Sequence, residues 1–198
     1  MTMHDSYLVD KVTGDCSWAK DCSWVRQVAA VLGASTIISL CAPISIPLFF
    51  TPIPIAIQAH VILLISCLLG SKRAALAVLA FLLQGAMGLP VFAGGRGGIY
   101  VLAGPTGGYL LGYLLAAFIT GYLMERSIYR TPSKAFAVMG LGNLVVYLFG
   151  ISWLSRYLGW ESALVLGMAP FLIGDLLKLV VATKFLKGLR YFYLPAFL

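Results

Sequence analysis

The segment GGRGGIYVLAGPTGG (residues 94–108) joins two apolar runs and is itself interrupted by glycines, a proline and one arginine. Both flanking runs are apolar enough to lie in a lipid bilayer. Irregular backbone at membrane depth is tolerated only where protein covers it or where it lines a wet cavity, because lipid cannot satisfy free N–H and C=O groups. Glycine also permits positive φ angles and a close approach of the backbone to a ligand. The segment therefore predicts a membrane protein with a glycine-walled pocket.

The composition supports a membrane protein. Of the 198 residues, 61% are hydrophobic and 11% charged, and the mean hydropathy is +0.95. A soluble domain carries roughly 25% charged residues. Six helices of about 20 residues fill most of the chain and leave no room for a second folded domain. We predict an all-α bundle over residues 24–190, with a polar N-terminal tail at 1–23 and a short C-terminal tail at 191–198.

Proline and glycine divide the apolar sequence into six predicted spans. Prolines at 43, 47, 52 and 54 end the first of them, because proline cannot continue a helix. The predicted spans cover residues 24–42, 55–69, 74–92, 105–124, 135–154 and a stretch from 170 to just before 187.

The lysines and arginines predict the orientation of the spans. With a cytoplasmic N-terminus, eleven of the fourteen fall in inner segments, and only Arg96 and Arg156 fall in outer loops. This positive-inside bias places both termini in the cytoplasm. It also explains the net charge of +7, so no nucleic-acid partner is predicted. The segment at 43–54 and the glycine-rich segment then lie together on the outer side.

Asp175 and the one remaining cation, Lys178, are the strongest candidates for a functional site. They stand three residues apart inside the last span and therefore share a helix face. Ionisable groups within a span are costly, face the interior and mark functional sites by default. The alternative is a structural ion pair that holds two helices together.

Three uncharged amides, Gln58, Gln84 and Asn143, also lie within apolar spans. Each can contact a ligand or form an ordinary hydrogen bond between helices. Gln84 is favoured as a ligand contact because it lies two turns before the glycine-rich segment. His60 stands alone on an apolar helix and is interpreted as a packed residue.

The glycine-rich segment supplies further candidates. Arg96 lies between two glycine pairs, where its guanidinium either clamps a carboxylate or is merely solvated. Gly95 and Gly98 are the candidate wall residues around it. Tyr100, together with Tyr109 and Tyr113, either walls an apolar ring or marks the membrane interface.

Other patterns concern partners and exclusions. Two pairs in the first span, Ala29/Gly33 and Ala30/Ala34, have the small-residue spacing that lets another helix approach closely. No glycine-lysine phosphate loop is present, so the chain is not expected to hydrolyse ATP. The cysteines lack a zinc-like spacing, and no metal site is predicted. No serine–histidine or paired-aspartate arrangement suggests intramembrane proteolysis.

Four motifs, in this order, resemble the BioY family of biotin-binding S components of energy-coupling factor (ECF) transporters. They are TPIPIAIQ (51–58), GLPVFAGG (88–95), GPTGGY (104–109) and GDLLK (174–178). The resemblance covers about residues 25–190. It implies a six-helix S-component fold in the cell inner membrane that captures biotin from outside, with no cofactor. It also implies a transmembrane coupling subunit and two ABC-type ATPases as partners.

The resemblance further implies roles for particular residues. Asp175, Lys178 and a polar residue of the third span, best matched by Gln84, bind the ligand, and Ala30 and Ala34 contact the coupling subunit. Chemically, Asp175 can accept the ureido N–H groups of biotin and Lys178 can donate to the ureido carbonyl. Two alternatives of other classes stay open: a stand-alone biotin facilitator without ATPases, and a membrane enzyme that uses Asp175 and Lys178 as acid and base. A related S component for another vitamin is a third.

Overall fold

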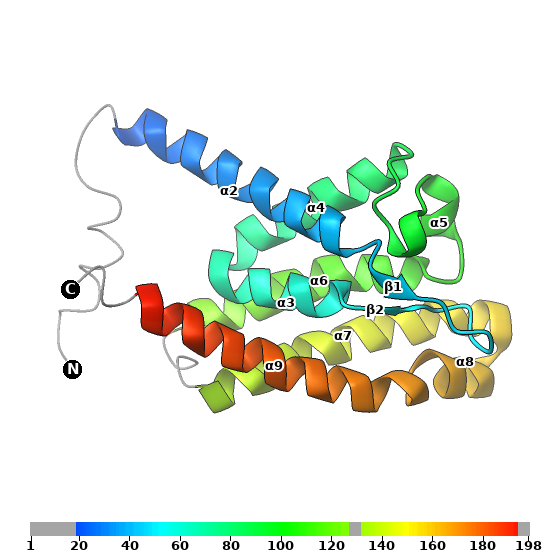
Figure 1. Cartoon of the computed structure of the whole chain (residues 1–198). Helices are drawn as coiled ribbons and strands as arrows, with labels where there is room; N and C mark the ends of the chain where they lie inside the picture. The colour runs from blue at the N-terminus through cyan, green and yellow to red at the C-terminus, as the bar shows by residue number, and fades with distance from the viewer. Residues whose placement is uncertain (1–18, 127–131, 194–198) are drawn as a thin grey trace.

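The computed structural model describes residues 19–126 and 132–193. Helices dominate this part of the chain, as predicted, and most run roughly along one direction (Figure 1). The elements, in chain order, are α2 (Ala19–Cys41), β1 (Ser45–Ile46), β2 (Ile55–Ala56), α3 (Gln58–Leu69), α4 (Ser71–Ala86), the 3₁₀ turn η1 (Ala93–Gly95), α5 (Ile99–Ala103), α6 (Gly107–Glu125), α7 (Pro132–Leu158), α8 (Trp160–Gly167) and α9 (Ala169–Tyr193).

The predicted spans correspond to α2, α3, α4, α6, α7 and α9. Four stretches of the described residues are helical, long and apolar enough to cross a membrane: Trp24–Cys41, Gly107–Glu125, Ser133–Leu158 and Trp160–Leu186. Both α3 and α4 are shorter than predicted. The count of six membrane crossings and the cytoplasmic placement of the termini stay predictions.

Several helix boundaries differ from those predicted, three of them for a local reason. The first helix begins at Ala19 rather than Trp24, because polar residues extend it beyond the apolar run. The second begins at Gln58 rather than 55, because β2 pairs antiparallel with β1. The third ends at Ala86, two residues before Gly88, whose φ of +99° takes the chain out of helix.

The loops that position the site gather at one end of the bundle. In Figure 1, β1, β2, α5 and α8 lie at the end opposite to the start of α2 and the end of α9. The segment at 43–54, which contains four prolines, meets the glycine-rich segment there. Together the two segments line a cavity of about 290 Å³. This confirms that the two segments lie together, although they are far apart in sequence.

The central pair α6 and α7 packs closely through glycines. A Cβ at Gly108 would lie 2.2 Å from the Cβ of Trp153, and a Cβ at Gly150 would lie 2.3 Å from the Tyr109 ring. Any larger residue would push the two helices apart. The absence of a side chain at these two positions therefore leaves the space that Trp153 and the Tyr109 ring occupy between the helices.

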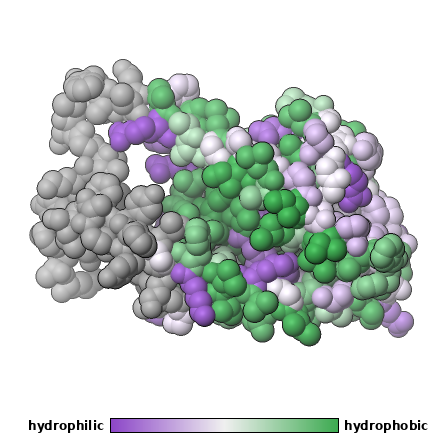
Figure 2. All heavy atoms as spheres, in the orientation of Figure 1, coloured by the Kyte–Doolittle hydropathy of each residue, from purple (hydrophilic) through white to green (hydrophobic). Residues whose placement is uncertain are grey.

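The outer faces of the helices are apolar. Apolar side chains cover much of the surface in Figure 2, and Leu40, Ile173 and Leu177 are among the most exposed hydrophobic residues. A soluble protein rarely exposes so large an apolar surface, whereas lipid accommodates it. The surface therefore agrees with a chain that lies within a bilayer.

Candidate ligand-binding site

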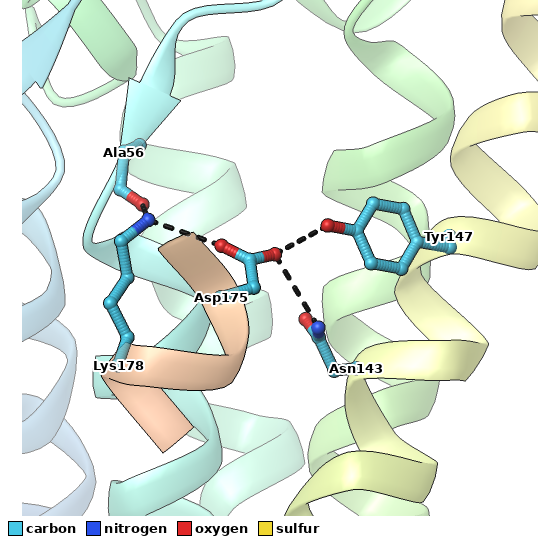
Figure 3. Close-up of polar contacts among 5 residues, drawn as sticks. All are labelled: Ala56, Asn143, Tyr147, Asp175 and Lys178. Carbon is cyan, nitrogen blue, oxygen red and sulfur yellow. Dashed lines mark hydrogen bonds and ion pairs between the residues drawn. The ribbon is translucent and has the colours of Figure 1, made fainter. Parts of the chain in front are cut away.

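Asp175 is the centre of a polar cluster inside the bundle (Figure 3). Its Oδ1 accepts a hydrogen bond from Lys178 Nζ at 3.1 Å, and its Oδ2 accepts one from the Tyr147 hydroxyl at 2.5 Å and one from Asn143 Nδ2 at 3.4 Å. Asp175 is 9% exposed. A carboxylate this deep is stable only when it is paired and hydrogen-bonded, and this one has both kinds of partner.

Lys178 links α9 to the chain before α3. Its Nζ donates to the main-chain carbonyl of Ala56 at 3.1 Å as well as to Asp175 (Figure 3). That carbonyl belongs to β2, and the pairing of β2 with β1 gives the strand a defined position. A lysine ammonium has three donors, so a third remains for a ligand or for water.

Two adjoining cavities extend from this cluster, and both are lined by Ile53, Pro54, Ala56, Tyr109 and Tyr113. Each has a volume of about 50 Å³, enough for a few water molecules. The first also contains the polar cluster around Asp175, together with Phe171 and Gly167. The second extends to Gln58, Phe92, Thr106 and Arg96. The site thus has a charged end, an aromatic middle and a guanidinium end.

Tyr109 has a fixed position between the two cavities. Its hydroxyl donates to the carbonyl of Gly167 at 2.9 Å, where α8 ends and the chain turns into α9. Tyr113 lies one helical turn further along α6 and is also buried. The pair offers flat apolar surfaces and polar tips, which suits a ring-containing ligand.

Seven of the residues singled out in the sequence line these cavities, and two of them, Tyr109 and Tyr113, line both. Asn143, Asp175 and Lys178 line one, and Gln58 and Arg96 line the other. Gln58 is 1% exposed, and its Nε2 has no hydrogen-bond partner among the described residues. Arg96 is exposed, and its Nε donates to the carbonyl of Ala93.

Gln84 lies outside both cavities. Its Oε1 accepts from Ser39 Oγ at 2.8 Å and its Nε2 donates to Ser35 Oγ at 3.2 Å, so its amide joins α4 to α2. Ala34 faces the same interior and is 6% exposed, while Ala30 is half-buried. The exposed small residues of this helix are Ala29 and Gly33.

The remaining glycine-segment candidates shape the loop and line neither cavity. Gly95 and Gly98 have φ angles of +68° and +102°, a region that other residues seldom adopt. Tyr100 packs beside Gly98 and is otherwise exposed. Sequence reasoning placed a glycine wall here, and the structure places a glycine-built turn that holds Arg96 at the cavity.

Two groups of the cluster were missed in the sequence. Tyr147 lies four residues after Asn143 and so on the same face of α7, a spacing that could have identified it. The carbonyl of Ala56 carries no signal in sequence, because any residue supplies one.

The apolar helices and the polar cluster that they enclose define a multi-pass membrane protein with internal cavities lined by charged, aromatic and amide side chains. The BioY family profile matches residues 10–193, and the chain belongs to the BioY family.

Named relatives and a solved structure agree with this assignment. The chain is 42% identical over 164 residues to the "Biotin transporter BioY" of Rhizobium etli, covering 78% of this chain and 87% of the relative. It is 44% identical over 149 residues to that of Thermotoga maritima, covering 75% and 86%. The crystal structure of the S-component for biotin from an ECF-type ABC transporter superposes with a TM-score of 0.77 at 27% identity, covering 90% of this chain and 95% of that one.

Proposed function

We propose that this chain is the biotin-binding S component of an ECF-type transporter in the cell inner membrane. It captures biotin from the outer side, and a transmembrane coupling subunit with two ABC-type ATPases supplies the energy for uptake. Family membership, the similarity to relatives named biotin transporters and the similarity to an S-component for biotin support this proposal. The observation that carries it is the Asp175–Lys178 pair at one end of an aromatic-lined site, with Arg96 at the other end.

The chemical groups of biotin match this arrangement of a charged pair, an aromatic lining and a guanidinium. Its ureido group has two N–H donors and a carbonyl acceptor, which complement the carboxylate of Asp175 and the free donor of Lys178. Its fused ring is apolar and suits Tyr109 and Tyr113. Its tail ends in a carboxylate, for which a guanidinium is the matching partner. The hydrogen bond from Asn143 to Asp175 is the longest of the three that Asp175 accepts. A ureido N–H of biotin would therefore replace the Asn143 amide more easily than the other two donors.

Binding requires the two cavities to merge. Each holds only a few waters, and biotin is larger than either. The side chain of Arg96 lines one cavity and is itself exposed, so it can move without disturbing the bundle core. Ligand entry from this end therefore fits the proposed direction of capture.

Biotin binding to the purified chain in detergent tests this proposal, measured by calorimetry. Asp175→Asn and Lys178→Ala should each abolish or strongly weaken binding. Lys184→Ala is the matched control, because Lys184 is an exposed cation on the same helix and should leave the affinity unchanged. Unchanged affinity in both site variants would contradict the assignment of the site.

Copurification from native membranes tests the partners. Recovery with a coupling subunit and ATPases supports the S-component function. Recovery without them, from cells that still accumulate biotin, supports the stand-alone facilitator.

A further inference from the structure

A separate cavity lies at the turn between α3 and α4. Its volume is about 700 Å³, within the range of roughly 300–1,000 Å³ that is typical of ligand pockets. Its walls come from the end of α3, the first turns of α4, the end of α6 and Gln27 of α2. Helix α3 leads away from β2 toward this turn (Figure 1), and no residue of this cavity lines either cavity of the ligand-binding site. The cavity is therefore distinct from that site.

The carboxylate in this cavity already has its partners. Glu125 Oε1 accepts hydrogen bonds from Ser71 N at 2.7 Å and Ser71 Oγ at 3.0 Å, and Oε2 accepts from Ser71 Oγ at 2.9 Å. A Cβ at Gly121 would lie 2.5 Å from Ser71 N, so α6 and the start of α4 are in close contact. Glu125 therefore caps the N-terminus of α4 and forms no ion pair with the cations beside it among the described residues.

Two cations of the same wall have no such partner. Lys72 and Arg73 are exposed, and neither forms a hydrogen bond or an ion pair with any described residue. Both lie in the first turn of α4, where the helix dipole disfavours positive charge. The positive-inside rule accounts for cations in this turn, but not for a large cavity beside them. An anion in the cavity would compensate both charges.

The apolar part of the wall indicates which kind of anion fits. Leu76 lies three residues after Arg73 and four after Lys72, so it shares their face of α4. Leu76 is 53% exposed, and Leu68 at the end of α3 is 50% exposed. In a bilayer these leucines contact acyl chains, while the long cationic side chains reach the headgroups. A phospholipid has an anionic head and apolar chains in this order, whereas free phosphate has no group for the leucines.

We propose that this cavity binds an anionic phospholipid, with its phosphate beside Lys72 and Arg73 and its acyl chains along Leu68 and Leu76. Basic pockets between transmembrane helices on the cytoplasmic side bind such headgroups, and the predicted orientation places this turn on that side. The lipid contacts α3 and α4 together, so its binding stabilises the folded chain. This inference goes beyond the proposed function and requires no biotin.

The test uses the full chain, freed of lipid in an uncharged detergent and titrated with phosphatidylglycerol or phosphatidylcholine in mixed micelles. Phosphatidylglycerol should raise the melting temperature of the wild type, because a ligand of the folded state stabilises it, and phosphatidylcholine should not. Lys72→Gln/Arg73→Gln should need about thirtyfold more phosphatidylglycerol for the same rise.

Lys134→Gln/Lys184→Gln is the matched control. It removes two exposed cations that the predicted orientation places on the same side of the membrane, and neither lines this cavity. The control should respond to phosphatidylglycerol like the wild type. A loss as large as that of Lys72→Gln/Arg73→Gln would show a general effect of surface charge and overturn the inference.

Three further outcomes would contradict it. They are equal responses of Lys72→Gln/Arg73→Gln and the wild type, equal responses to the two lipids, and a rise with inorganic phosphate as large as with phosphatidylglycerol, which would show a site for free anions. If the double variant does not fold, Arg73→Gln alone decides, with an expected loss of about fivefold. Biotin affinity enters none of these outcomes, so the proposed function is tested separately.

Discussion

Lys178 donates from one ammonium group to the carboxylate of Asp175 and to the main-chain carbonyl of Ala56, both at 3.1 Å. One side chain thus joins α9 to the strand that precedes α3. The two acceptors are far apart in sequence: Asp175 is 3 residues and Ala56 is 122 residues from Lys178. A ligand that takes a donor from Lys178 will therefore act on the loop before α3 as well as on α9.

Breaking this pair on one side should destabilise the protein more than removing both charges. Lys178→Met leaves Asp175 buried without its cation, and we expect a loss of about 3 kcal/mol of unfolding free energy. The double variant Asp175→Asn/Lys178→Met should recover most of that loss, because no uncompensated charge remains. Unfolding of the ligand-free protein in detergent measures both. A double variant as unstable as the single one would argue against a charge-pairing effect.

Removing the Tyr147 hydroxyl should weaken both the cluster and ligand binding. Tyr147→Phe deletes the 2.5 Å hydrogen bond to Asp175 Oδ2, a bond to a charged group worth about 1.5–3 kcal/mol. Tyr157→Phe is the control, since its exposed hydroxyl donates to the carbonyl of Ala103, away from the cavities. Biotin titrations of the two variants make the comparison, and equal affinities would show that Tyr147 does not position Asp175.

Arg96 should discriminate between biotin and a biotin amide. Arg96→Gln removes the guanidinium that we propose binds the tail carboxylate, so biotin affinity should fall about tenfold, while affinity for the uncharged amide should not change. Arg156→Gln is a suitable control, because Arg156 is stacked over Trp153 and lines neither cavity. Equal losses for biotin and its amide would place the carboxylate elsewhere.

Gln58 and Gln84 should respond differently to the same substitution. Gln58→Leu changes a cavity wall and should lower biotin affinity. Gln84→Leu removes two hydrogen bonds to α2 and should lower stability by about 1–2 kcal/mol, with a smaller effect on affinity. Calorimetry and thermal unfolding of both variants make the test. A larger affinity loss in Gln84→Leu would support the prediction from family resemblance that Gln84 binds the ligand.

The packing of the glycine-rich segment can be tested at Gly85. A Cβ there would lie 2.0 Å from the ring of Phe92, which packs edge-on against Phe81 and lines a cavity. Gly85→Ala should therefore cost about 1–3 kcal/mol by overpacking. Gly33→Ala meets no atom within 4 Å and should stabilise α2 by about 0.5–1 kcal/mol. Thermal unfolding compares the two, and a stabilised Gly85→Ala would contradict this packing.

Local sequence was enough to predict the membrane class, the order of the helices and the Asp175–Lys178 pair. Hydropathy acts residue by residue, and groups three residues apart on a helix share a face whatever surrounds it. The same reasoning found Asn143, because a polar side chain in an apolar run requires a partner.

Tertiary packing decided which of these polar groups meet. Gln58 and Gln84 look alike in sequence, but the rotation of each helix turns one toward the cavity and the other toward Ser35 and Ser39. The contact between Lys178 and Ala56 depends on a strand pairing that no periodicity predicts, since it involves only two residues on each side. Spacing along one helix is local and can be read from sequence, whereas contacts between helices depend on how every other element packs.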